Sequence, residues 1–451
     1  MIAGMGQHGK AFADSTLAAG RPVISIATSA QRKLAKGHIP LERDATEPDA
    51  WRNIAVETAK ALVLTLPSNA ANLTALSAVL KTLKPAEKLV GHAQNPLTIH
   101  VALEDGQTRN AFLENEEALK PFPGCEVRPY SVSELIARRF FSEVPVHARA
   151  RALGHRRLHM VFAGRGPVNQ ALILQFLKIC PAYGFDMPKL SLVSEEPENW
   201  HDELLNDYPG IETLAEFDLA VWHKKYAHPA ADDLKRIEDG GAVTSIFVDL
   251  GEGEHNAVAA RLLRAFCRRE SVWRAPTYFQ ARRGANLAHF FDETGDAIPD
   301  PIQPLSSAET VCTLTAIDGT DDREARQVHT AYRQERRDSN GAAALPWEQL
   351  TETHRAASRR AADYQPVLEE SLSAAREERS TGPASLAAET RSDETTLRTA
   401  LEHASWCNER ILAGWRFGSS RDDERMFHPD LPEATGTSAT ATRPGSQLDM
   451  Q

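Results

Sequence analysis

No stretch of the 451 residues is apolar over the roughly 20 positions needed to cross a bilayer. No basic block stands clear of neighbouring acids, and the formal net charge is −11, which excludes a general nucleic-acid binder. The five cysteines are far apart and form no C-x-x-C pair, so they offer no metal site and fit reduced thiols. We therefore expect a soluble cytoplasmic protein without a nucleic-acid partner, either free or held at the inner face of the membrane by a partner.

The chain also lacks the usual signatures of nucleotide-dependent enzymes. A dehydrogenase or epimerase needs an acid–base group beside the nicotinamide, such as Tyr-x-x-x-Lys, and the sequence has none. No Gly-Lys-Ser/Thr follows a glycine turn, which argues against a P-loop ATPase. The histidines are scattered along the chain. No catalytic residue and no metal ligand is therefore predicted.

A glycine-rich turn, G-x-G-x-x-G at residues 4–9, opens the chain after a short apolar run. Such a turn between a buried strand and a helix lets backbone N–H groups and the helix N-terminus hold a pyrophosphate. Residues 10–19 have the pattern of a helix, Gly20 that of its stop, and residues 22–27 that of the next buried strand. Nucleotide binding is predicted at this turn, against the alternative of a fold that has lost its ligand. The residues are Gly4, Gly6, Gln7, His8 and Gly9.

Strands and helices alternate to about residue 142. Further strands are expected at 61–66 and 98–103, and helices at 49–54, from Asn72 onward and at 131–142. This alternation predicts an α/β domain with a doubly wound parallel sheet over residues 1–150. Only three residues precede the glycine turn, where a first strand usually has about five or six. Either this strand is short or the chain begins inside a longer product.

The acid that usually binds the ribose hydroxyls after the second strand is missing. Thr28 and Ser29 stand there, followed by Arg32. These residues suit a phosphorylated ribose or another anionic nucleotide better than plain NAD, or they form a solvated basic turn. The predicted cofactor is therefore NAD(P) or another adenine nucleotide.

A second, half-similar copy begins near residue 157. An apolar strand at 158–163 precedes a modified glycine turn with Gly164 and Gly166, a helix at 170–179 and a strand that ends in an acid, Glu195. Asn169 replaces the third glycine, and its side chain would push the helix away from the sheet or fill the phosphate space. We expect a second Rossmann-like domain over residues 151–320. It either binds a ligand through Gly164, Gly166 and Glu195 or is a structural or dimerising pseudo-domain.

The pattern becomes helical after a proline-rich turn at 299–304, which predicts an all-α module over residues 321–431 and a disordered polar tail over 432–451. Aromatic and charged side chains of this module could stack a base and pair with phosphate, or could form the core of a helix hairpin. They are Glu402, His403, Trp406, Arg410, Trp415, Arg421 and His428.

The first domain resembles the nucleotide-binding KTN/RCK (TrkA-N-like) domains of potassium-transport regulators. The matching pieces are the turn at 4–9, the segment at 44–46, the strand end at 66–69 with Asn72, and the helix at 133–137. The resemblance implies a homodimer and a ligand held by the glycine turn and the end of the second strand. It also implies ligand contacts from two further loops, with Asp44, Ala45, Thr46, Pro67, Ser68 and Asn69.

The seven side chains named in the helical module lie in a stretch that resembles the ryanodine-receptor (RyR) repeat, found as a free-standing module in bacterial proteins. Residues 347–364 are similar to the first helix of that repeat, but Ser358 stands where the repeat has asparagine, and a polar tail replaces its further helix. Such modules occur beside Rossmann-type sensors, and the resemblance implies a nucleotide-derived ligand.

Together these patterns predict a nucleotide-sensing regulatory protein, of potassium or other ion transport. Nucleotide binding at the first turn is expected to shift the relative position of the domains, and a channel, transporter or effector protein to read that shift. An NAD(P)-dependent oxidoreductase and an interaction scaffold with inactive nucleotide sites are the alternatives.

Overall fold

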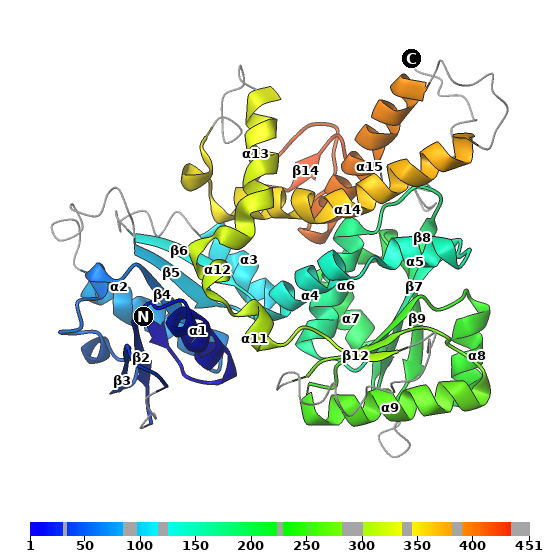
Figure 1. Ribbon diagram of the computed structural model, residues 1–451. Coiled ribbons are helices and arrows are strands. Elements are labelled where there is room, and N and C mark those ends of the chain that lie inside the picture. The colour runs from blue at the N-terminus through cyan, green and yellow to red at the C-terminus, as the bar shows by residue number, and fades with distance from the viewer. Residues whose placement is uncertain are drawn as a thin grey trace. The chain divides into compact units, whose positions relative to one another are not determined.

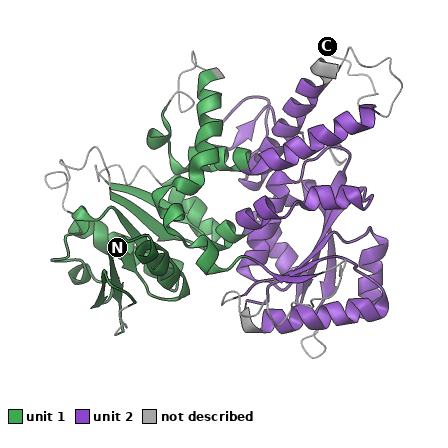
Figure 2. Cartoon of the chain, viewed as in Figure 1, with its two compact units in different colours: residues 1–136, 306–362 green, residues 137–305, 363–451 purple. Residues whose placement is uncertain are grey.

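The computed structural model describes residues 1–29, 34–83, 97–115, 125–222, 229–251, 253–281, 301–335, 345–380 and 390–433. The chain divides into two compact units, each built from two segments (Figure 2). Unit 1 comprises Met1–Ile136 and Ser306–Ala362, and unit 2 comprises Ala137–Leu305 and Asp363–Gln451. The helical residues after 305 are thus shared between the two units, and the boundaries expected at 150 and 320 do not coincide with them.

Unit 1 contains a six-stranded parallel sheet of order β3-β2-β1-β4-β5-β6. Its strands are β1 (Ile2–Ala3), β2 (Val23–Ala27), β3 (His38–Glu42), β4 (Ala61–Leu64), β5 (Leu97–Ala102) and β6 (Cys125–Tyr130). The helices that follow them are α1 (Gln7–Ala18), α2 (Asn69–Thr82), α3 (Gly106–Glu114) and α4 (Val132–Glu143), and α4 belongs to unit 2 from Ala137 onward (Figure 1). The expected parallel α/β architecture is confirmed for this unit.

Two local expectations for unit 1 were wrong. Residues 49–54 do not form a helix: a 3-10 turn, Pro48–Ala50, is followed by irregular backbone. Asn53 and Ala55 have positive φ angles of 63° and 46°, which α-helical backbone does not allow. The helix expected to start at Asn72 starts three residues earlier, because the Ser68 hydroxyl accepts a hydrogen bond from the Ala71 N–H (3.1 Å) as its N-cap.

The core of unit 1 lies between the sheet and its helices. Strands β2, β4 and β5 contribute fully buried aliphatic side chains such as Ile26, Leu62 and Ile99. Trp51, 1% exposed, closes this core and donates its indole N–H to the Ala45 carbonyl (2.8 Å). Burying these side chains, at about 1.5–3 kcal/mol each, is what fixes the helices on the sheet.

Residues 306–362 complete unit 1, although the second sheet precedes them in the chain. Helices α11 (Ala308–Val311) and α12 (Leu314–Asp318) pack against α1, where the Leu314 N–H donates to the Ser15 hydroxyl (3.0 Å). Helix α13 (Arg323–Glu335) and the start of α14 (Glu352–Ser380) follow. Arg355 at the start of α14 is 1% exposed and pairs with Glu126 on the edge strand β6, which anchors this segment to the sheet.

Unit 2 repeats the topology of unit 1, with order β12-β11-β10-β7-β8-β9. Its strands are β7 (Arg157–Ala163), β8 (Asp186–Ser194), β9 (Glu216–Val221), β10 (Ser245–Val248), β11 (Thr277–Phe279) and β12 (Ile302–Pro304). Its helices include α5 (Val146–Ala152), α6 (Pro167–Ile179), α7 (Pro197–Asp207), α8 (Ala231–Asp239) and α9 (Gly253–Glu270). The expected second Rossmann-like sheet is confirmed.

An aromatic stack holds the core of unit 2. The Phe162 ring on β7 stacks on the Phe247 ring of β10, with centroids 5.2 Å apart, and Phe140 of α4 meets Phe247 edge-on at 5.1 Å. Such pairs contribute about 0.5–1.5 kcal/mol beyond the burial of their area. These contacts hold the central strands β7 and β10 together, and the second glycine turn follows β7.

The C-terminal helices of unit 2 pack on α6 and the loop after it. The Tyr364 hydroxyl of α14 donates to the Pro181 carbonyl (2.7 Å), and the Ser405 hydroxyl of α15 (Thr390–Leu412) donates to the Lys178 carbonyl (2.8 Å). Two short paired strands, β13 (Arg416–Phe417) and β14 (Phe427–His428), follow α15. Among the helices of the described part of the chain, none is both long and apolar enough to span a membrane.

Candidate functional site

The first glycine turn lies at the topological switch point of the unit 1 sheet. From β1 the chain continues to β2 and β3 on one side, whereas β4 to β6 lie on the other side. In a parallel sheet the loops that follow β1 and β4 therefore diverge at the carboxyl edge, and the crevice between them is where open α/β sheets bind ligands. The glycine turn follows β1, and the loop with Pro67, Ser68 and Asn69 follows β4.

Packing requires two of the three glycines in this turn. Gly4 has φ +89°, and a Cβ there would lie 2.7 Å from the Thr65 carbonyl carbon. A Cβ on Gly9 would overlap the Gly4 carbonyl oxygen. These glycines let the turn lie directly against β4 and let α1 approach the turn closely.

Gly6 is different, because the surrounding structure does not require a glycine there. Its φ is −64°, and a Cβ built on it would meet no atom within 4 Å. Gly6 is also the N-cap of α1, which has no side-chain cap and no acid in its first turn. The N-terminus of α1 thus keeps both its partial positive charge and open space beside Gly6, the two things that a phosphate needs.

Gln7 and His8 form the first turn of α1, and both are half-buried. Burial lowers the pKa of His8 below its usual value, although the carboxylates of Glu104 and Glu309 act in the opposite direction. The imidazole is therefore neutral at pH 7 and can donate or accept a hydrogen bond beside the turn.

The predicted residues after β2 and β3 surround the same edge of the sheet. Thr28 and Ser29 are exposed after β2, and Arg32 lies outside the described residues. After β3, the Asp44 carboxylate accepts hydrogen bonds from the Thr46 N–H (2.9 Å) and hydroxyl (2.7 Å), which hold its pKa below the usual value. Ala45 is buried beneath this turn. Asp44 thus shapes its own loop.

The loop after β4 is held by its own side chains. Ser68 caps α2, and the Asn69 side-chain oxygen accepts from the Glu104 N–H (3.0 Å). Pro67 is exposed. Both polar side chains thus bond backbone N–H groups of unit 1.

Asn72 is a positioning residue that sequence reasoning did not assign correctly. Its side chain is 2% exposed, accepts from the Leu66 N–H (2.8 Å) and donates to the Ala102 carbonyl (3.0 Å). It thereby ties the carboxyl ends of β4 and β5 together. The signal was available, because Asn256 follows Leu250 in unit 2 at the same spacing, accepts from its N–H (2.7 Å) and donates to the carbonyl of Gln280 (2.9 Å).

The first glycine of the second turn packs like that of the first turn, but a side chain of the protein itself lies beside the second glycine. Gly164 has φ +92° and packs against the Asp249 carbonyl, as Gly4 packs against that of Thr65. Asn169 does not point outward: its amide donates to the Gly164 carbonyl (2.7 Å) and lies fully buried between turn and helix. A Cβ on Gly166 would overlap the carboxylate of Asp249.

The Asp249 carboxylate also accepts a hydrogen bond from the Val168 N–H (3.0 Å) in the first turn of α6. Asp249 itself is 2% exposed. The space beside Gly166 is therefore occupied by a carboxylate of the chain itself. Glu195 is exposed at the end of β8.

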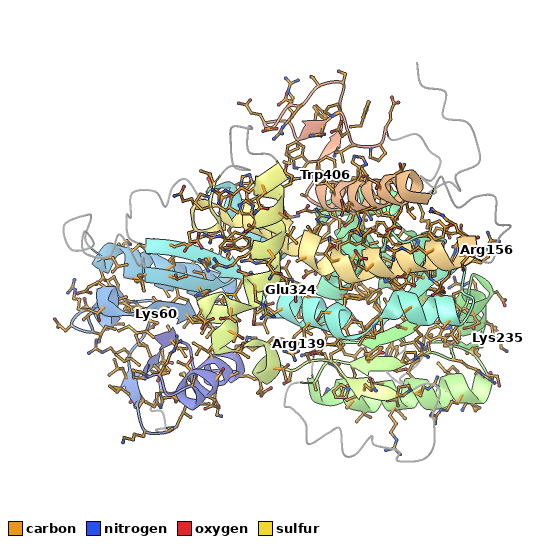
Figure 3. All side chains as sticks on the ribbon, turned by 45° about the horizontal axis from the view of Figure 1, so that its top comes forward. Lys60, Arg139, Arg156, Lys235, Glu324 and Trp406 are labelled. Atoms are coloured by element: carbon orange, nitrogen blue, oxygen red, sulfur yellow. The ribbon has the colours of Figure 1, made fainter. Side chains whose placement is uncertain are left out.

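The C-terminal region brings five of its seven predicted side chains together. The Trp406 ring on α15 (Figure 3) stacks on His403 with centroids 5.5 Å apart and meets His428 of β14 edge-on at 5.0 Å. The Arg410 guanidinium lies over both Trp406 (5.9 Å) and Trp415 (5.5 Å). We call these five residues the aromatic cluster. A cation is thus already present between its two indoles.

The two remaining residues are engaged elsewhere. Arg421 pairs with Asp423 (2.6 Å), and Glu402 is exposed, 4.0 Å from Arg398 of the same helix. Within the described ranges, no group of three or more His, Cys, Asp or Glu could hold a metal ion.

Comparison with known proteins adds one family. Residues 1–109 match the TrkA-N domain, which confirms the resemblance to KTN/RCK domains for the part of unit 1 that carries the first glycine turn. No functionally curated protein matches the sequence. The RyR resemblance stays a prediction.

Two solved structures resemble the chain in fold. One is described as the GsuK Channel (14% sequence identity, TM-score 0.42) and the other as GsuK bound to ADP (14%, TM-score 0.41). Each match covers 69% of this chain, and it covers 65% and 66% of the two GsuK chains. The chain therefore spans just under two thirds of the length of these neighbours.

Proposed function

We propose that unit 1 binds the pyrophosphate of an adenine nucleotide, NAD(P) or another, at the first glycine turn. The observation that carries the proposal is the start of α1, which has no side-chain cap and has open space at Gly6, in a domain that matches TrkA-N. Thr28, Ser29, Asp44 and the loop after β4 lie at the same carboxyl edge and would contact the sugar and base.

The role that fits such a site in this chain is regulatory. The described residues show no metal cluster, and the sequence has no Tyr-x-x-x-Lys to serve a nicotinamide. We therefore propose a ligand sensor, acting as a homodimer in the cytoplasm or at the inner face of the membrane. An ion channel, a transporter or an effector protein would read its nucleotide-bound state. An oxidoreductase is the second candidate, and an inactive scaffold the third.

The test is a thermal-shift screen of the full chain with NAD⁺, NADH, NADP⁺, NADPH, ATP, ADP and AMP. A ligand at a hundredfold excess over its Kd stabilises the folded state by roughly 2.7 kcal/mol, which is about 5–10 °C for a unit of this size. A response to one ligand class supports the sensor. No response to any of them supports the scaffold, and turnover of NAD(P)H with a carbonyl substrate supports the oxidoreductase.

The variant Gly6→Asp separates binding from folding. Its Cβ enters open space, and aspartate is a better N-cap than glycine, so the unliganded Tm should stay the same or rise. Its carboxylate would occupy the phosphate space, so the ligand response should be lost. Thr313→Asp adds the same charge at the N-cap of α12, which contacts the far half of α1, and should respond like the wild type. A full response in Gly6→Asp would contradict the proposed site.

Sensing also requires that the ligand changes the protein's conformation. We expect the small-angle X-ray scattering curve of the full chain to change on addition of the nucleotide found in the screen. A curve that is unchanged at saturation would leave a binding protein without the proposed switch.

The aromatic cluster is a second candidate ligand site, in keeping with the RyR resemblance. The convergence of Trp406, Trp415 and Arg410 favours it, because an indole can stack a base and a guanidinium can pair with a phosphate. In its present arrangement Arg410 lies over both indoles itself, so a base would have to displace it. A nucleotide response that survives in Gly6→Asp but is lost in Trp406→Ala would place a site here.

A further inference from the structure

The residue directly after the fourth strand of each sheet is equivalent in the two units. In unit 1 the Thr65 N–H donates to the Ala3 carbonyl (2.9 Å), and in unit 2 the Asp249 N–H donates to the Ala163 carbonyl (2.9 Å). Each residue also presents its own carbonyl to the first glycine of its turn, where a Cβ would lie 2.7 Å from the carbonyl carbon in both units. In both units the following leucine, Leu66 or Leu250, donates its N–H to the side chain of an asparagine six residues later, which completes the correspondence.

The side chains at these equivalent positions differ in reach and charge. The Asp249 carboxylate accepts from the Val168 N–H (3.0 Å), from the Gly251 N–H (3.1 Å) and from the Asn256 amide (3.3 Å). It lies against Gly166, the second glycine of its turn. The Thr65 methyl group instead faces the third glycine of its turn, 3.1 Å from a Cβ built there, and leaves the space beside the second glycine open.

Helix N-termini attract anions because their first N–H groups have no partner within the helix. In unit 2 the partner of a first-turn N–H group is Asp249, which lies 81 residues after Val168 in the chain. Both of its carboxylate oxygens are hydrogen-bonded, and the residue is only 2% exposed. A phosphate brought to the same place would meet a buried negative charge and an occupied N–H group, and both oppose binding.

We infer that Asp249 is a built-in anion that takes the place of a ligand phosphate in unit 2. The residue after the fourth strand, Thr65 or Asp249, thereby determines which of the two glycine turns accepts an anionic ligand. The role of Asp249 stands on the unit 2 contacts alone, and only the role of Thr65 rests on the proposed function of unit 1.

Chemical rescue by inorganic phosphate tests the role of Asp249. In the full chain, Asp249→Ala should unfold at a lower temperature than the wild type. Saturating phosphate should raise its Tm by roughly 3 °C more than it raises that of the wild type, with ionic strength matched by chloride. Phosphate would then occupy the space that the carboxylate has left.

Glu238→Ala is the matched control for the rescue. Glu238 also accepts a backbone hydrogen bond, from the Trp273 N–H (2.9 Å), but it does so without a glycine turn. Its loss should not be rescued by phosphate. The same phosphate response in wild type, Asp249→Ala and Glu238→Ala would overturn the inference. If the alanine variant does not fold, Asp249→Ser, which keeps a short acceptor for the Val168 N–H, replaces it.

The converse experiment places the carboxylate in unit 1. Thr65→Asp should abolish the nucleotide response, tested with ADP and NADP⁺, whereas the uncharged isostere Thr65→Val should keep it. A Thr65→Asp variant that binds as well as Thr65→Val would overturn the role of this position. If the wild type itself shows no response, the proposed function of unit 1 fails, whereas the phosphate rescue of Asp249→Ala still decides the role of Asp249.

Discussion

Removing the buried guanidinium of Arg355 should destabilise unit 1 strongly. This side chain, 1% exposed, pairs with Glu126 of β6 and donates to the carbonyls of Trp347 and Glu348 (3.2 Å each). Arg355→Met keeps the apolar stem but removes one donor from each of two carbonyls and one of the two arginine partners of Glu126, which keeps Arg128 (2.8 Å). Breaking a buried pair from one side costs about 3–5 kcal/mol, so we expect the Tm of unit 1 to fall by roughly 10 °C.

The same pair predicts a pH dependence with a definite sign. Burial alone would raise the pKa of Glu126, but hydrogen bonds and charge from Arg128 and Arg355 hold it below its usual value. A carboxyl with a depressed pKa stabilises the folded state above its ordinary pKa of about 4.3, and this contribution is lost as the pH falls through the folded value. The difference in unfolding free energy between wild type and Arg355→Met should therefore narrow below about pH 5.

The assay is thermal and urea unfolding of the full chain between pH 7 and pH 4. Arg376→Met on the same helix is the matched control, because Arg376 pairs with Glu394 in an exposed position and its loss should change the Tm by less than about 1 °C. A Tm of Arg355→Met within about 2 °C of the wild type at pH 7 would refute the assignment of residues 306–362 to the fold of unit 1.

Two further variants and one labelling experiment test the site and the core. Gly4→Ala should lower the free energy of unfolding by about 3 kcal/mol or more, because an L side chain must adopt a positive φ against β4. Urea unfolding measures this loss, and a loss below about 1 kcal/mol would contradict the close approach of Gly4 to β4. Asn72→Ala should lower the free energy of unfolding by about 2–3 kcal/mol, because it removes the side-chain partner of the half-buried Leu66 N–H and of the buried Ala102 carbonyl. A Tm equal to that of the wild type would show that these bonds contribute little. Burial raises the pKa of Cys180 and Cys267 to about 12, so in the native chain at pH 8 they should react with a thiol reagent only as fast as the protein unfolds, measured by peptide mapping; fast labelling would show that they are accessible.

Much of the architecture could be predicted because it is encoded locally. The spacing of apolar runs and the stop at Gly20 predicted alternating strands and helices, and this alternation leads to a parallel sheet in both halves. The turn at Gly4 could be recognised because only glycine suits its positive φ against β4. The start of α2 was misplaced because the Ser68 hydroxyl caps a helix that begins three residues before Asn72. Asn72 instead lies inside α2, where its side chain bonds the ends of β4 and β5.

The sequence by itself determined that the chain has two glycine turns, each between a strand and a helix, since the residues that make such a turn are neighbours in the chain. The sequence also showed that Asn169 replaces the third glycine of the second turn, but only the tertiary structure decided what lies beside the second glycine of each turn. The space beside Gly166 is filled by the carboxylate of Asp249, more than 80 residues later in the chain, whereas the space beside Gly6 is open. The tertiary structure alone also showed that residues 306–362 belong to unit 1, although residues of unit 2 precede them in the chain. Both outcomes depend on contacts between residues far apart in the chain, and such contacts leave no local pattern.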